Sequence, residues 1–129
     1  MKRLARMGIN LSAFVLMLLL GKEACFGQNN DVKRKYRLAI SFASECCGID
    51  QKAEDRFKKF IAAQERKNRI KLESIETHWD KEGERNYCFE LKGLSKSKQK
   101  SLISALRKLL APHKLVQVKE NGYCRSSMF

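Results

Sequence analysis

The sequence contains none of the short motifs that mark several common enzyme classes. It has no Gly-rich phosphate loop, no G-x-G-x-x-G dinucleotide fingerprint and no H-E-x-x-H zinc motif. Its five cysteines and two histidines do not form a recognisable nucleophile–base motif either. These absences argue against nucleotide-dependent, zinc-protease and cysteine-hydrolase chemistry. We therefore expect a non-enzymatic protein that uses no cofactor.

The sequence also lacks an apolar run long enough to cross a membrane. The longest run, residues 9–20, is broken by Asn10 and Ser12, and a bilayer core requires about 20 apolar residues. Basic residues precede the run, and Lys22 and Glu23 end it. A positive start followed by a short apolar segment is typical of a cleavable secretory signal peptide. No transmembrane anchor is expected after cleavage.

The small residues Cys25 and Gly27 suit the −3 and −1 positions of a signal-peptidase site. We therefore expect residues 1–27 to be removed and the mature chain to begin at Gln28, in a secreted or periplasmic location. An alternative is lipidation of Cys25. Lipoproteins usually carry leucine or a similar residue three positions before that cysteine, where this chain has Lys22, so the cut after Gly27 is preferred.

The mature chain is strongly basic, with 23 lysines and arginines against 13 acidic residues. Such an excess predicts attraction to polyanions, so the expected partner is an anionic surface or another exported protein. The contact candidates form two clusters in the sequence, and they are Lys33, Arg34, Lys35, Arg66, Lys67 and Arg69. The alternative is a solvated basic surface with no dedicated partner.

Periodicity divides the mature chain into six elements after a polar tail, residues 28–35. Period-two alternation predicts strands over residues 36–42, 70–79, 87–91 and 116–118. Helical spacing predicts a helix capped by Asp50 and running to about Arg66, and a second that begins at Ser95 or Ser97 and ends before Pro112. A tight turn is expected at residues 121–122.

The order strand, helix, strand, strand, helix, strand is that of a split βαβ arrangement. In this order the chain resembles small exported ferredoxin-like proteins over residues 36–120. The resemblance implies an α+β domain, residues 36–129, with a four-stranded antiparallel sheet and both helices on one face. Many unrelated functions use this fold, so the resemblance implies no activity.

The alternating strands predict which side chains face the helices. Tyr36, Phe42, Tyr87 and Phe89 should face them, while the open face should carry Arg37, Ala39, Ser41 and Cys88. The expected core contains Phe42, Phe57, Phe60, Phe89, Leu106 and Leu110. Domains of this fold that bind RNA stack bases on aromatic residues of the open face, and none is expected there, so nucleic acid is not an expected partner.

Four cysteines remain after signal cleavage, and an even number in an exported chain predicts disulfide bonds. Cys88 should lie on the open face, where the segment that carries Cys124 can fold back over it. The rival pairing joins Cys88 to Cys46 or Cys47, because the first and third strands should be neighbours. The sequence slightly favours the pair Cys88 and Cys124.

Two further functions stay open beside a binding module. Ferredoxin-like heavy-metal carriers hold two cysteines in the loop that here carries Cys46 and Cys47, so a soft-metal carrier is one alternative. The carriers have two residues between their cysteines, whereas these two are adjacent and should point apart. The other alternative is a propeptide-like or inhibitor-like domain that docks on a protease through its sheet. His78 could be a ligand or a base, but an ordinary residue beside the hairpin turn is preferred, and His113 is expected to be a surface residue.

Overall fold

The computed structural model describes residues 34–125 of the chain. The expected signal peptide, its cut between Gly27 and Gln28, the lipidation candidate Cys25 and the tail residue Lys33 lie outside the described residues. Six elements follow in the predicted order, and they are β1 (Lys35–Phe42), α2 (Gln51–Asn68), β2 (Ser74–His78), β3 (Arg85–Phe89), α3 (Lys96–Leu110) and β4 (Val116–Tyr123).

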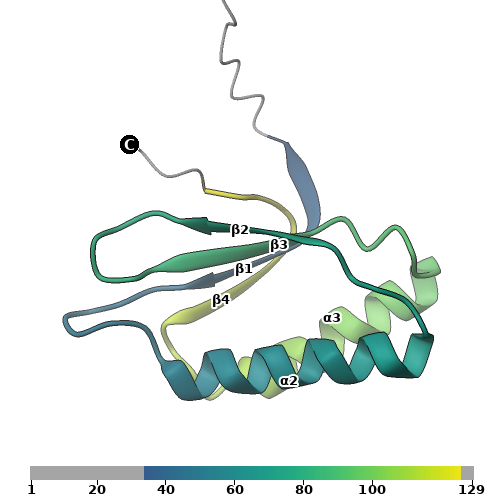
Figure 1. The fold of residues 1–129 in the computed structure, drawn as a ribbon, viewed down its shortest axis with the longest axis horizontal. Coiled ribbons are helices and arrows are strands. Elements are labelled where there is room, and N and C mark those ends of the chain that lie inside the picture. Colours follow the sequence, from purple (N-terminus) through teal and green to yellow (C-terminus); the bar gives the residue numbers. More distant parts are fainter. Residues whose placement is uncertain (1–33, 126–129) are drawn as a thin grey trace, which may run out of the picture. The chain divides into compact units, whose positions relative to one another are not determined.

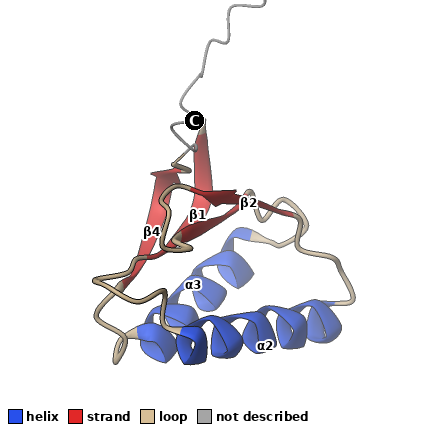
Figure 2. Cartoon of the chain, turned by 60° about the vertical axis from the view of Figure 1, so that its left-hand side comes forward, coloured by secondary structure: helices blue, strands red, loops and turns tan. Residues whose placement is uncertain are grey.

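The four strands form one antiparallel sheet in the order β2-β3-β1-β4. Both helices lie against the same face of this sheet, and the opposite face carries no helix (Figures 1 and 2). The predicted fold class, an α+β ferredoxin-like split βαβ arrangement, is confirmed. Strands β1 and β3 are central, whereas β2 and β4 form the two edges.

Local capping signals set the helix starts. The side chain of Asp50 accepts a hydrogen bond from the amide of Ala53 at 3.0 Å, and Ser95 accepts one from Lys98 at 3.3 Å. These bonds satisfy amide groups that the first turn of a helix leaves without a partner. Asp50 is the predicted cap, and Ser95 is one of the two predicted for the second helix.

The core lies between the sheet and the two helices. Its centre is a group of aromatic rings, in which Phe57 of α2 lies 4.9 Å from Tyr87 and 6.1 Å from Phe89, measured between ring centroids. Five of the six predicted core residues are buried in this core, and the sixth, Phe60, is partly buried and packs against it. The prediction of the core is confirmed.

The second strand is shorter than predicted. It begins at Ser74 instead of Ile70, although Leu72 is still buried. The amide of Leu72 donates a hydrogen bond to the carboxylate of Glu65 at 2.8 Å. The chain before β2 is thus tied to the end of α2 and not to a neighbouring strand, and its apolar residues fill the core without forming a ladder.

The predicted faces are wrong for Tyr36 and Arg37. Tyr36 packs with Ala39 and Cys88 on the open face, whereas Arg37 donates a hydrogen bond to Gln99 of α3 at 3.0 Å. The pairing of β1 with β4 is interrupted at this point, where Asn121 has a left-handed φ of 51°. At this irregularity Tyr36 and Arg37 of β1 exchange the faces that simple alternation predicts for them. Strand β4 continues to Tyr123 instead of turning at residues 121–122.

Candidate functional site

A disulfide bond joins Cys88 to Cys124 on the open face of the sheet, with their Cα atoms 6.0 Å apart. This is the pairing that the sequence slightly favours over a bond from Cys88 to Cys46 or Cys47. Cys88 lies in the central strand β3 and is 1 % exposed. The bond therefore attaches the segment after β4 to the middle of the sheet.

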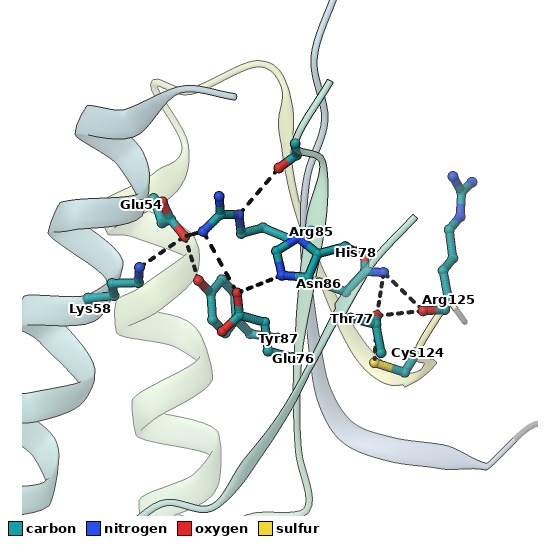
Figure 3. A network of polar contacts seen from close by, with 11 residues as sticks. Glu54, Lys58, Glu76, Thr77, His78, Arg85, Asn86, Tyr87, Cys124 and Arg125 are labelled. Carbon is teal, nitrogen blue, oxygen red and sulfur yellow. Dashed lines mark hydrogen bonds and ion pairs between the residues drawn. The ribbon is translucent and has the colours of Figure 1, made fainter. Parts of the chain in front are cut away.

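The segment after β4 crosses the sheet to its other edge (Figure 3). The carbonyl oxygen of Arg125 accepts hydrogen bonds from Thr77 of β2 at 2.5 Å and from Asn86 of β3 at 3.4 Å. The Arg125 guanidinium lies 4.6 Å from the centroid of the Trp79 ring. We call residues 124 and 125 the C-terminal strap, and it covers part of the face that the helices leave open.

A groove of about 780 Å³ lies beside the strap, near the exposed edge strand β2. Its lining includes Tyr36, Cys88 and Ile75, and Ile75 is 46 % exposed. Lys71 and Arg34 line it as well and contribute positive charge.

The predicted polyanion contacts do not all meet in this groove. Arg34 lines it, where it pairs with Glu90, and Lys35 lies beside the ring of Tyr123. The other three are at the end of α2, where Arg66 and Lys67 occupy the last turn and Arg69 is the C-cap, and none of them lines the groove.

The positive charge is concentrated elsewhere, on α3. This helix carries five basic residues and no acidic one, and all five side chains are exposed. They are Lys96, Lys98, Lys100, Arg107 and Lys108, which we call the α3 basic surface. By contrast, residues 45–84 hold ten acidic and nine basic residues. None of these five residues is among the contact candidates predicted from the sequence, although the composition of the helix is visible there.

Glu120 of β4 is the acidic residue beside the α3 basic surface. Its carboxylate accepts hydrogen bonds from Arg37 at 2.6 Å and from Arg107 at 3.3 Å. The bond from Arg37, followed by the charges of Arg37, Arg107 and Lys100, lowers the pKa of Glu120. Glu120 is thus neutralised by more than one cation, and it leaves a positive excess at the junction of α3 and β4.

Cys46 and Cys47 are free and exposed in the loop between β1 and α2. Their sulfur atoms lie 2.8 Å apart, so the expectation that adjacent side chains point away from each other is wrong here. Within residues 34–125 no group of three or more histidine, cysteine or carboxylate side chains is placed to hold a metal ion. A soft ion bound here would have only the two thiolates as ligands from this arrangement.

A buried carboxylate, Glu54 of α2, forms a second polar centre (Figure 3). It is 2 % exposed and accepts hydrogen bonds from the Tyr87 hydroxyl at 2.5 Å and from Arg85 at 3.1 Å, and Lys58 lies 3.1 Å away. Burial alone would raise the pKa of Glu54, but the bonds from Tyr87 and Lys58 and the charge of Arg85 outweigh it, so the pKa is lowered. The network ties α2 to β3.

The sequence analysis missed Glu54, although the sequence carries a signal for it. Glu54 lies three residues before Phe57 and seven before Ile61, so it shares the apolar stripe of its helix. A carboxylate on a buried stripe requires a partner, because an unpaired buried charge is strongly unfavourable. The tyrosine and arginine that supply the partners are on β3, which only the folded chain brings close.

We expect Glu54→Gln to lower the free energy of unfolding at neutral pH by about 1–3 kcal/mol, since charged hydrogen bonds are lost. The lowered native pKa means that the carboxylate stabilises the fold above the usual glutamate pKa and loses this effect as pH falls through the native pKa. The difference from wild type should therefore shrink in acid. Urea unfolding across this pH range measures it. Asp55→Asn, an exposed neighbour, is the control, and an equal effect in both variants would contradict the assignment.

The two histidines differ in their surroundings. His78 is exposed and its Nε2 lies 3.3 Å from Glu76. His113 is only 14 % exposed, and its Nδ1 lies 2.6 Å from the carboxylate of Asp50, so the expectation of a surface residue is wrong. The amide of Ala53 and then the His113 side chain lower the pKa of Asp50. His113 thus helps to hold the capping residue of α2 in place.

The chain matches no protein-family model, no curated protein and no solved structure. Neither helix of residues 34–125 has the length and apolar character needed to span a bilayer.

Proposed function

We propose that the protein is an exported, non-enzymatic binding module that attaches to an anionic partner through the α3 basic surface. The signal-like residues 1–27 support export. The Cys88–Cys124 bond is compatible with an oxidising compartment. The composition of α3 is the observation that carries the proposal.

The lysines at the start of α3 do not stabilise the helix that holds them. Lys96 and Lys98 are at its amino-terminal end, where the helix dipole is positive and favours acidic residues. An anion at this surface would relieve the repulsion between the lysines and the dipole. A purely structural role does not account for this placement of charge.

Helical spacing puts several of these side chains in one row. Lys96, Lys100 and Arg107 are separated by four and seven residues, so they project from the same side of α3. Arg107 contacts Glu120, which places this row toward β4. The row suits an extended anion with repeated charges better than a single small ion.

Heparin serves as a soluble polyanion to test the proposal. We expect the triple variant Lys96→Gln, Lys100→Gln, Lys108→Gln to bind it about tenfold more weakly, because three exposed charge contacts contribute about 0.5 kcal/mol each. The affinity of the wild type should fall with added salt, as screening of exposed charges requires. Titration calorimetry at two salt concentrations measures both effects.

A matched control changes the same number of charges on α2. Lys52, Lys59 and Lys67 are exposed, and replacing all three with glutamine gives the same net charge as the α3 variant. We expect this control to retain most of the heparin affinity. An equal loss in the two variants would mean that total charge and not the α3 basic surface determines binding, and it would refute the proposed site.

A further inference from the structure

The loop between β1 and α2 presents two thiols on a fixed frame. Glu45, Cys46 and Cys47 are exposed at its tip. A hydrogen bond closes the base of this tip, because the amide of Gly48 donates to the Ser44 hydroxyl at 3.1 Å. We call residues 44–48 the dithiol loop.

The frame of this loop is anchored to the turn between β2 and β3. The amide of Ser44 donates a hydrogen bond to Glu84 at 3.0 Å, and its hydroxyl donates one to Glu82 at 2.9 Å. Glu84 is 6 % exposed, so this anchor is buried. Gly48 has a φ of 100°, which favours glycine, so the chain can turn sharply into α2.

The two sulfur atoms are within reach of a covalent bond. They are 2.8 Å apart, and a disulfide bond measures about 2.05 Å, so the sulfur atoms are already close to bonding distance. Closing the bond also requires the peptide between the two residues to adjust, because adjacent Cα atoms lie closer together than in most disulfides. Both thiols are exposed, so a reagent in solvent can reach them. Cys88 and Cys124 differ in this respect, because Cys88 is buried under the strap.

We propose that Cys46 and Cys47 form a reversible dithiol–disulfide site that exchanges electrons with small-molecule or protein disulfides. One thiolate attacks the disulfide of the oxidant, forms a mixed disulfide and releases one thiol. The second cysteine then attacks the sulfur of the first, which closes the Cys46–Cys47 bond and releases the second thiol. Two protons and two electrons leave the protein, and the oxidant is reduced to two thiols.

The surroundings of Cys46 disfavour its thiolate form. The contact with Cys47, a small loss of hydration and the negative charges of Glu82 and Glu45 raise the pKa of Cys46. The neighbouring groups therefore do not activate Cys46 as a nucleophile, because the thiolate is the reactive form of cysteine.

Peptide mapping of the full chain tests this site separately from polyanion binding. The protein is equilibrated in glutathione buffers of graded redox ratio, alkylated in its remaining thiols and digested with trypsin. Cleavage after Arg37 and Lys52 yields a peptide, residues 38–52, that contains both cysteines. In reducing buffers we expect this peptide to carry two labels. In oxidising buffers it should carry none, and its mass should be two hydrogens lower than that of the unlabelled dithiol peptide. Dithiothreitol should restore both labels while peptides 86–92 and 120–125 are still linked.

Single variants separate ring closure from other thiol chemistry. Cys46→Ser and Cys47→Ser leave one thiol each, which should accumulate as a mixed disulfide with glutathione in the buffers that close the wild-type ring. Two labels retained by wild type in every oxidising buffer, a stable glutathione adduct, or a link to a second chain would overturn the proposal. Heparin affinity should not change in either variant, so failure of this site is distinguishable from failure of the α3 basic surface.

Discussion

Replacing Phe89 with alanine is expected to lower the free energy of unfolding by about 3–5 kcal/mol. Phe89 is 2 % exposed, lies opposite Leu38 in the sheet and packs against the ring of Phe57. Its removal eliminates buried apolar contacts and leaves a cavity that the surrounding side chains only partly fill. The loss is a large part of the roughly 5–15 kcal/mol that stabilises a typical domain.

Equilibrium unfolding in urea measures this effect. Phe89→Leu keeps most of the volume and should lose less than about 1.5 kcal/mol, so it provides a value even if the alanine variant does not fold. Tyr123→Ala, at an exposed aromatic residue, is the control and should change stability by no more than about 0.5 kcal/mol. A loss below about 1 kcal/mol for Phe89→Ala would contradict a buried position in the core.

Removing the disulfide in the double variant Cys88→Ala, Cys124→Ala should lower the free energy of unfolding by about 4 kcal/mol. The bond closes a loop of 36 residues, and without it the unfolded chain gains conformational freedom. The native state changes as well, since the hydrogen bonds from Thr77 and Asn86 to Arg125 lose the attachment that holds the strap in place.

The matched control for this experiment is Cys46→Ser, Cys47→Ser, which removes the two exposed cysteines. We expect the control to unfold at nearly the same denaturant concentration as wild type. Hydrogen exchange adds a local measurement, because amides under the strap should exchange faster only in the variant without the disulfide. Equal destabilisation in both double variants would mean that the Cys88–Cys124 bond contributes nothing specific.

Local signals in the sequence were sufficient for the order of the elements and for the helix starts. Asp50 caps α2 because its side chain reaches an amide three residues away. Such a short-range contact can be predicted from the sequence without knowledge of the tertiary structure. The core was also predictable, since Phe42, Phe57 and Phe89 occupy strictly periodic positions. The preferred cysteine pair followed from the topology together with the face of Cys88.

The errors arose where distant residues determine the local structure. Leu72 lies outside β2 because its amide binds Glu65, and Tyr36 changes face where Asn121 interrupts the pairing of two strands. His113 is withdrawn from solvent by Asp50, which is 63 residues earlier in the chain. None of these contacts leaves a periodic pattern in the sequence. The excess of basic residues in α3 is visible in its composition, but only the structure shows that Glu120 is paired with Arg37 and Arg107.

The unequal distribution of charge gives the domain an electric dipole moment directed toward α3. In the field of an anionic surface such a moment produces a torque, which turns α3 toward the surface before contact and increases the fraction of productive collisions. The torque extends over about 10 Å at 0.1 M salt, the screening distance of the solution. The helices and the open face lie on opposite sides of the domain (Figure 1). A molecule oriented in this way therefore turns the open face of the sheet and its strap away from the surface.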